Sequence, residues 1–263
     1  MKKMRVIIIV LSMIVGFALT AYAGVAKQMS KDTLYQVSTL EALMEGVYDG
    51  EIRLDELLMH GDFGIGTFED LNGEMVVLNG VVYQVPALGE VVKAKNSVKT
   101  PFAMITAFET DVQLKLDNVK NLAEMKQQIL DILPSKNKFY AIKVPGNFKY
   151  VKTRSVAGQK LPYPRLADVT KDQTVFEFKD VEGTLVGYWC PEYAEGLNMA
   201  GFHLHFLSAD GKKGGHLLEC SLGKGAALLD ITTELQVLLP GNKHFAEISL
   251  RKVPKEEKQK VEQ

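Results

Sequence analysis

The stretch G-F-H-L-H-F-L-S-A-D-G-K-K-G-G-H-L-L-E, from Gly201 to Glu219, holds two apolar runs joined by a polar turn. Side chains at positions i and i+2 of a β-strand point to the same face of the sheet. His203 and His205 therefore project together if the first run is a strand. A two-residue turn at Asp210-Gly211 then sends the chain back as an antiparallel strand.

The register of this hairpin decides whether a third histidine joins the first two. With the turn at Asp210-Gly211, His216 lies directly opposite His205, with Cβ atoms about 5 Å apart on one face. A slip of one residue would turn His216 to the other face. Gly214-Gly215 could also host a bulge, so the convergence depends on the register.

Three converging imidazoles are typical of a metal site. The chain has five histidines, and His203, His205 and His216 fall within one short stretch. Three histidines with a vacant fourth position are the ligand set of many catalytic zinc sites, and imidazole suits zinc better than calcium or magnesium. The alternative is three unrelated histidines, two of them in a core strand. We favour Zn²⁺, or another divalent metal, and expect His60 and His244 to be surface or packing residues.

The rest of the chain reads mostly as strands. Two runs, Glu74–Leu78 and Val81–Val85, are separated by Asn79-Gly80, which is a strong hairpin signal because both residues tolerate positive φ. Together with the glycine-rich stretch before Asn72-Gly73 they predict a β-meander. Further strands are expected at residues 102–108, 112–116, 139–144, 148–156, 174–178, 184–189, 201–207, 216–222 and 235–239.

Helices are few in this pattern. Ser38-Thr39-Leu40-Glu41 has the spacing of a capping box and predicts a helix over 39–47, with a second short helix over 54–59. One long helix is expected over 118–133, because Leu122, Met125, Ile129 and Leu133 form a single apolar stripe. The predicted fold class is therefore α+β, dominated by strands.

Composition and charge exclude several classes of protein. Of the 263 residues, 46% are hydrophobic and 24% are charged, which is typical of a folded globular chain and excludes disorder or coiled coil as the main state. The leader contains three of the 31 basic residues and no acidic one, so the remainder has a net charge of −4. A mildly acidic chain of this kind is not expected to bind nucleic acid.

The N-terminus reads as a secretory signal peptide. A basic start, Met1–Arg5, precedes the apolar run Val6–Ala21, and Ala21-Tyr22-Ala23 is an A-x-A cleavage pattern. We expect cleavage after Ala23, export to the periplasm or the medium, and no membrane attachment afterwards. An uncleaved anchor is the alternative.

The cysteines predict no disulfide scaffold. Cys190 and Cys220 each lie in an apolar, strand-like run. An exported chain could join them, but buried thiols are the simpler interpretation, and the paired C-x-x-C of a cysteine metal site is missing.

Three stretches carry a resemblance to a known family. They are H-G-D-F-G-I-G-T-F-E-D-L-N-G-E-M (His60–Met75), Y-V-K-T-R-S-V (Tyr150–Val156), and G-L-N-M-A-G-F-H-L-H-F with the following G-G-H-L-L-E (Gly196–Glu219). With them the sequence, from about Leu34 to Pro240, resembles the bacterial α-acetolactate decarboxylases, which form acetoin. The first and third stretches are specific in combination.

The resemblance implies a fold and a set of site residues. It implies two β-rich subdomains with mixed or antiparallel sheets around one metal cleft, which we place at 30–165, including the long helix, and at 166–263, and it implies a homodimer. It also places zinc on the three histidines and the family's remaining site residues on Arg154, Thr67, Glu74 and a glutamate near the C-terminus. Glu262 is the best match for that glutamate, with Glu256 and Glu257 as alternatives. Without the resemblance, Arg154, Glu74 and Thr67 would read as a surface ion pair, a hairpin carboxylate and a strand former.

The residue types fit the implied reaction. Loss of carbon dioxide from 2-acetolactate leaves an electron pair that passes into the neighbouring ketone, giving an enediolate that zinc can stabilise as a Lewis acid. Arg154 can hold a carboxylate or the developing charge, Thr67 can hydrogen-bond the substrate, and Glu74 or Glu262 can supply the proton. Two other hypotheses remain: another exported three-histidine zinc lyase or hydrolase, since a strand-borne H-x-H also serves α-type carbonic anhydrases, and a zinc-binding protein without catalysis.

Overall fold

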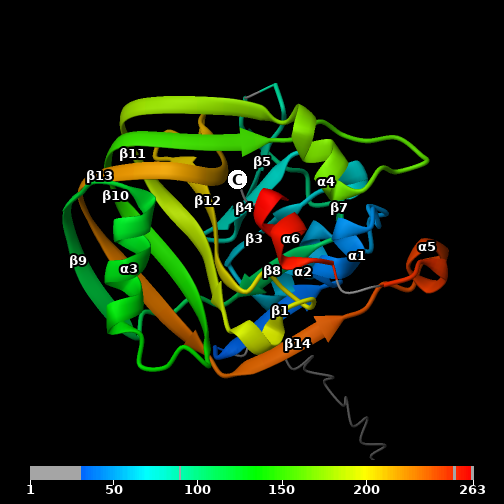
Figure 1. Ribbon diagram of the computed structural model, residues 1–263, viewed down its shortest axis with the longest axis horizontal. Coiled ribbons are helices and arrows are strands. Elements are labelled where there is room, and N and C mark those ends of the chain that lie inside the picture. The colour runs from blue at the N-terminus through cyan, green and yellow to red at the C-terminus, as the bar shows by residue number, and fades with distance from the viewer. Residues whose placement is uncertain (1–30, 89, 251–252, 262–263) are drawn as a thin grey trace, which may run out of the picture.

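The computed structural model describes residues 31–88, 90–250 and 253–261 (Figure 1). The predicted signal peptide and Glu262 lie outside the described residues. Within the described part of the chain, no helix combines the length and apolarity that a membrane-spanning helix requires.

The first sheet has seven strands in the order β14-β1-β8-β3-β4-β5-β6. Its strands are β1 (Thr33–Val37), β3 (Phe63–Thr67), β4 (Glu74–Leu78), β5 (Val81–Val85), β6 (Val92–Lys93), β8 (Ala103–Thr106) and β14 (Glu234–Leu238). β1 pairs with β14 in parallel and with β8 antiparallel, so the sheet is mixed. The predicted meander of β3, β4 and β5 is confirmed, with Asn79 and Gly80 at φ of 52° and 73° in its turn.

The second sheet has five strands in the order β10-β11-β12-β13-β9, and β10 also pairs with β13, so that β10 to β13 close into a ring. These strands are β9 (Val112–Val119), β10 (Phe139–Ser155), β11 (Thr174–Cys190), β12 (Gly201–Ser208) and β13 (Gly214–Thr232). β10 was expected as two strands broken near Pro145. It is one strand because Pro145 and Gly146 keep their antiparallel partners on β11, and the irregularities fall in its pairing with β13.

The helices are short, apart from one. They are α1 (Leu40–Met44), α2 (Leu54–Leu57), α3 (Leu122–Ile132), α4 (Leu166–Val169), α5 (Lys243–Glu247) and α6 (Lys255–Val261), with single 3-10 turns at Leu58–His60, Glu69–Leu71, Thr170–Asp172 and Glu192–Ala194. A small separate sheet joins β2 (Ile52–Arg53) and β7 (Lys99–Thr100).

Local capping explains where the predicted helices differ from those observed. Thr39 caps α1 as expected, accepting from the Ala42 amide, but Gly46 at φ of 93° ends the helix early. α3 begins at Leu122 rather than near 118, because Asn121 is its N-cap and accepts from the Glu124 amide at 2.8 Å. The predicted apolar stripe of α3 is confirmed, since Leu122, Met125 and Ile129 are buried.

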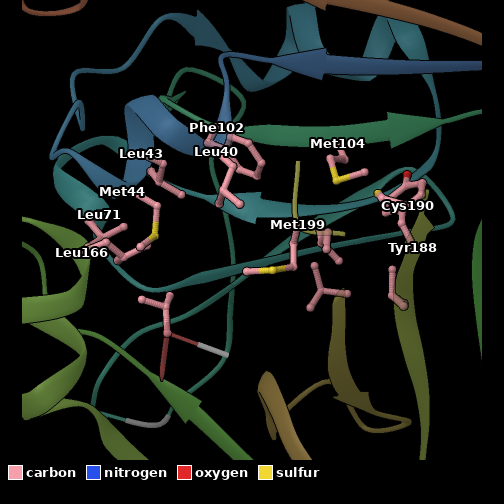
Figure 2. Close-up of a cluster of buried hydrophobic side chains, with 14 of the residues drawn as sticks. Leu40, Leu43, Met44, Leu71, Phe102, Met104, Leu166, Tyr188, Cys190 and Met199 are labelled. Carbon is pink, nitrogen blue, oxygen red and sulfur yellow. The ribbon is translucent and has the colours of Figure 1, made fainter. Parts of the chain in front are cut away.

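The main core lies between the two sheets. It combines Leu40, Leu43 and Phe102 with Tyr188 and Cys190 of β11, as Figure 2 shows. The Tyr188 hydroxyl donates to the Phe63 carbonyl at 3.0 Å and so links the sheets directly. A second core fills the strand ring beneath α3. The predicted boundary between residues 165 and 166 does not separate the sheets, because β9, α3 and β10 belong with β11 to β13.

The two cysteines are buried thiols without a disulfide between them, as predicted. Burial raises the pKa of Cys220 to about 12, which keeps that thiol protonated and unreactive.

Candidate metal centre

The three histidines of the hairpin meet on one face of the second sheet. β12 and β13 pair with His205 directly opposite His216, which is the predicted register. The ring centroids of the three imidazoles lie 5.1 to 5.3 Å apart, and each ring offers a nitrogen within 4.8 Å of the others. Gly215 keeps the register between the two strands. Its φ is 129°, and a Cβ at this position would lie 2.6 Å from the Arg154 carbonyl oxygen. Both facts favour glycine here.

Two of the imidazoles, those of His203 and His205, are held in the neutral form that binds metals. Burial, followed by the positive charges of Arg154 and Lys126, lowers the pKa of His203 to about 3. Burial likewise lowers the pKa of His205 to about 4, although the charge of Glu74 acts in the opposite direction. Near neutral pH, protons therefore do not compete for these ring nitrogens.

The hydrogen bonds leave ring nitrogens available to a metal. His205 Nδ1 lies 2.8 Å from the Met75 carbonyl oxygen, so Nδ1 carries the proton and Nε2 keeps its lone pair. A hydrogen bond from the second ring nitrogen to a carbonyl oxygen commonly orients a metal-ligating histidine. Within the described residues, His203 Nδ1 is buried and has no hydrogen-bond partner. This donor set fits a divalent metal that favours nitrogen ligands, as zinc does.

A buried ion pair borders the histidines. Arg154 lies on β10 opposite His216, and its Nη1 donates to Glu74 Oε1 at 2.5 Å. Glu74 comes from β4 of the first sheet, and its Oε2 lies 3.5 Å from His205 Nε2. Both side chains are less than 10% exposed, so their charges face each other and the imidazoles rather than water.

Thr67 joins the same group from β3. It is the Cα partner of Glu74 across the β3–β4 pair. Its hydroxyl donates to the Gly73 carbonyl at 2.8 Å and keeps the capacity to accept one hydrogen bond. The structure thus brings together six of the seven predicted site residues, namely Thr67, Glu74, Arg154, His203, His205 and His216, around a cavity of about 40 Å³.

The wall of this cavity is apolar and comes from several elements. It consists of Leu40, Leu43, Leu71, Phe102, Val156, Leu166 and Val261. Val261 is the last described residue of α6, and its carbonyl accepts from Arg154 Nη2 at 2.9 Å. The C-terminal tail, which by composition alone reads as a solvated end, therefore reaches the site.

A buried ion pair holds α6 in place, and sequence reasoning missed it. Lys258 is 2% exposed and its Nζ lies 2.6 Å from Glu41 Oε1, while Glu41 Oε2 accepts from the Val253 amide. A lysine in a run of charged residues gives no signal of burial in the sequence. Glu257 pairs with Arg165 at 2.9 Å, and Glu256 is exposed.

The two remaining histidines lie apart from the triad. His60 stacks on Tyr35 with ring centroids 3.5 Å apart, and His244 Nδ1 lies 3.0 Å from Asp49 Oδ2. The stacking of His60 is a packing contact, and the pair of His244 with Asp49 is partly exposed, as expected from the sequence.

Comparison with known proteins decides the family. The model of the α-acetolactate decarboxylase family matches residues 34–252. The chain belongs to this family. It is therefore a decarboxylating lyase, as the sequence resemblance implied.

Curated relatives and solved structures agree with the assignment to the α-acetolactate decarboxylases. The chain is 47% identical to the Methanosarcina mazei member over 89% of this chain and 81% of that protein, and 40% identical to the Brevibacillus brevis member over 92% of each. The crystal structure of the Bacillus subtilis strain 168 member superposes with a TM-score of 0.85 at 35% identity, covering 88% of this chain and 99% of that one. The strand-dominated α+β fold predicted from the sequence is confirmed.

Proposed function

We propose that the chain converts 2-acetolactate to acetoin and carbon dioxide at the site formed by His203, His205 and His216. The observation that carries the proposal is the enclosure of three imidazoles, a guanidinium and a carboxylate in one buried cavity. The names of relatives 34–47% identical to the chain support the same substrate.

The proposed metal is Zn²⁺, because His203, His205 and His216 would hold it through three imidazole nitrogens, the ligand type that zinc favours. When bound, a divalent metal supplies Lewis-acid stabilisation of negative charge that develops on the ketone and hydroxyl oxygens of the substrate.

Arg154 is proposed to bind and orient the carboxylate of the substrate. Its guanidinium is held from two sides, by Glu74 and by the Val261 carbonyl, so its plane is fixed before substrate arrives. A planar, permanently charged fork of this kind suits a carboxylate better than an ammonium does. The carbon–carboxylate bond then breaks, carbon dioxide leaves, and the electron pair passes into the ketone as an enediolate.

Glu74 is proposed to handle the proton that completes the reaction. The enediolate needs one proton on the carbon that lost the carboxylate in order to become acetoin. Glu74 lies between Arg154 and His205, and its Oε2 faces the imidazole at 3.5 Å, so it borders the reacting centre. Glu262 remains a proposed second carboxylate from the tail, and Thr67 a hydrogen-bond partner of the substrate.

The apolar wall is proposed to exclude bulk water. Leu43, Phe102 and Val261 lie beside the polar groups in the cavity. Electrostatic interactions are stronger where water is excluded, so the ion pair and the imidazoles act on the substrate at full effect.

An assay of product formation tests this function. The full chain loaded with zinc should release acetoin and carbon dioxide in equal amounts from racemic 2-acetolactate, and the variant with all three histidines changed to alanine should release neither. Zinc binding by the wild-type chain without acetoin formation would instead favour the non-catalytic zinc protein or a different zinc lyase or hydrolase.

We also propose that the chain is exported after cleavage behind Ala23 and works as a homodimer. The leader composition supports the first point and the resemblance supports the second. N-terminal sequencing of the secreted protein and light scattering of the purified protein test them separately.

A further inference from the structure

Glu41 of α1 is a buried carboxylate that joins three segments far apart in the sequence. Its Oε2 accepts from the Val253 amide at 3.0 Å and its Oε1 accepts from Lys258 Nζ at 2.6 Å, so both contacts hold the C-terminal tail. Its own amide donates to the Gly196 carbonyl at 3.1 Å, in the loop that leads into β12. Glu41 thus connects α1, the tail and the segment before the histidine strand.

The loop before β12 leaves room for the Glu41 side chain. Gly196 has a φ of 96°, and a Cβ at this position would lie 3.2 Å from Glu41 Oε1. Glycine therefore suits the position both by its backbone conformation and by the close approach of the carboxylate. The amide of Leu40 donates to the Leu197 carbonyl at 3.0 Å, so the loop is fixed to the first turn of α1.

Of the ion pairs that hold α6, the pair with Glu41 is the most buried. Lys258 is 2% exposed, and Glu195 Oε1 is a more distant neighbour of its Nζ, at 3.8 Å. Glu257 pairs with Arg165, but the Arg165 side chain is 42% exposed. Exposed pairs contribute little, whereas losing one partner of a buried pair leaves the other charge without compensation. The placement of α6 therefore depends more on Glu41 than on Arg165.

The same side of α6 faces both Glu41 and the site. Lys258 and Val261 are three positions apart and so lie on one side of the helix. Both are buried, and Val261 lines the cavity at the histidine triad. Figure 1 shows α6, in red, next to α1. A change in the contact between Lys258 and Glu41 is therefore passed directly to Val261.

The Val261 carbonyl helps to set the orientation of the Arg154 guanidinium. Nη1 donates to Glu74 and Nη2 donates to this carbonyl at 2.9 Å. Within the described residues, Arg154 Nε is buried and has no hydrogen-bond partner. Because the guanidinium is planar and rigid, its two fixed ends determine the direction of the Nε–H group. That donor is available to a carboxylate bound in the cavity that Arg154 lines.

We infer that Glu41 is a positioning residue for the decarboxylation, which sets the orientation of Arg154 through Lys258 and Val261. This rests on the proposed function. Glu41 does not itself line the cavity at the triad, so it acts on the substrate through other residues. A tail that shifts by a fraction of a turn would turn the guanidinium away from the substrate carboxylate, and small errors in such contacts slow a reaction strongly.

Glu41→Gln tests the inference in the zinc-loaded full chain. The amide keeps an oxygen for the Val253 amide but loses the charge that pairs with Lys258. It should lower kcat/KM by about 10- to 100-fold, as misplacing a catalytic group by an ångström does, and leave the zinc content unchanged. Glu56→Gln, the same change at an exposed position in the first turn of α2, is the matched control and should match wild type.

Two further variants separate positioning from a general loss of stability. In the Arg154→Lys background, Glu41→Gln should add little further loss, because both changes disturb the same contact. Glu41→Asp keeps the charge but withdraws it by one methylene group, so it should fold and show a smaller loss of kcat/KM in the same direction.

The second readout needs no activity. Phenylglyoxal modifies arginine side chains, and mass spectrometry after digestion gives the rate at Arg154, which is 4% exposed. This rate should rise in Glu41→Gln and stay at the wild-type value in Glu56→Gln, while circular dichroism shows both variants to be folded.

The outcomes distinguish the inference from the proposed function. A wild-type modification rate at Arg154 in Glu41→Gln would overturn the inference whatever the activity, and so would a wild-type kcat/KM. A loss in the Arg154→Lys background as large as in wild type would overturn it as well. If Arg154 is modified faster in Glu41→Gln but the wild-type chain forms no acetoin, Glu41 positions the arginine and the proposed reaction is wrong.

Discussion

Glu74 and Arg154 form a buried ion pair that joins the two sheets beside the histidine triad, with Glu74 Oε1 2.5 Å from Arg154 Nη1. Glu74 begins β4 in the first sheet and Arg154 lies near the end of β10 in the second. Removing one partner of a buried pair typically costs about 3–5 kcal/mol, because the other charge is left uncompensated. The pair therefore links the two sheets and also keeps both side chains beside His205.

Replacing Arg154 by lysine should leave the fold and the metal content intact and remove most activity. Lysine keeps the charge but loses the planar fork that reaches Glu74 and Val261 at once. One weakened charged contact in the transition state costs roughly 2–4 kcal/mol, or about 30- to 1000-fold in kcat. Steady-state kinetics on zinc-loaded protein check this, with Arg53→Lys, in an exposed pair with Asp55, as the control. Wild-type acetoin formation by Arg154→Lys would favour a binding protein without catalysis.

Replacing Glu74 by glutamine should reduce kcat by about 10²- to 10⁴-fold, since an amide cannot transfer the proton. The amide still offers an oxygen to Arg154, so the two sheets should stay joined, but the guanidinium loses its counter-charge and the melting temperature should fall. Glu69→Gln, an exposed residue preceding the same hairpin, provides the control. A Glu74→Gln variant with unchanged kcat would move the proton transfer to another group, with Glu262 the next candidate.

Replacing His203 by alanine should remove metal and activity together, because two imidazoles leave a tetrahedral set incomplete. Elemental analysis of the purified protein measures the metal directly. His244→Ala, which alters a contact with Asp49 away from the triad, should keep full metal content. Full occupancy in a variant lacking all three triad histidines would contradict the site.

The tail should be required for activity although it is rich in charge. Val253 and Val261 are buried, and Lys258 is paired with Glu41, which offsets the roughly 1–2 kcal/mol of backbone entropy lost per ordered residue. A chain ending at Val253 should lose the Val261 carbonyl that holds Arg154 and form acetoin slowly. Lys258→Met should be impaired in the same direction, while Lys243→Met, in an exposed pair on α5, should not.

The Glu262→Gln variant distinguishes Glu262 from Glu256 and Glu257 as the tail carboxylate at the proposed metal. If truncation is damaging and Glu262→Gln is damaging too, Glu262 is the carboxylate at the metal. If truncation is damaging and Glu262→Gln is harmless, Glu256 or Glu257 becomes the better candidate. Wild-type acetoin formation by both the truncated chain and Glu262→Gln would make the tail a solvated end and leave Glu74 alone as the proton source.

Asp230 should make the fold less stable as pH rises. Burial, with the charges of Asp111, Asp32 and Glu109, raises the pKa of this carboxyl from 3.8 to about 7. A raised carboxyl pKa contributes stability that is present at low pH and is lost between the unfolded and the folded pKa, here from about pH 4 to pH 7. Asp230→Asn removes this loss. Near pH 8 the variant should therefore have a free energy of unfolding that is larger than that of wild type by roughly 2–4 kcal/mol, measured by urea denaturation. Equal pH dependence in the two proteins would show that Asp230 titrates normally.

The hairpin that carries the triad could be predicted because local rules determine it. A strand period of two and a two-residue turn suffice to place His205 opposite His216, provided that Gly214 and Gly215 host no bulge, and the observed pairing has none there. The hairpin of β4 and β5 was predictable for the same reason, through Asn79 and Gly80.

The long strands and the tail could not be predicted in this way. β10 continues through Pro145 and Gly146 because partners on β11 hold it, and such pairing is a long-range property that a local breaker signal cannot show. The burial of Lys258 depends on Glu41, more than two hundred residues away in the chain. Arg154 and Glu74 were assigned by family resemblance alone, since neither lies near the histidine pair in sequence.

Acetoin formation from racemic 2-acetolactate by the zinc-loaded chain, followed through chelation and zinc addition, tests the central claim most directly. The account predicts that acetoin formation stops when the chelator removes the metal and returns when zinc is added back. It also predicts that His203→Ala does not recover under the same treatment. Acetoin formation at an unchanged rate by the metal-free chain, or none by the zinc-loaded chain, would contradict the account.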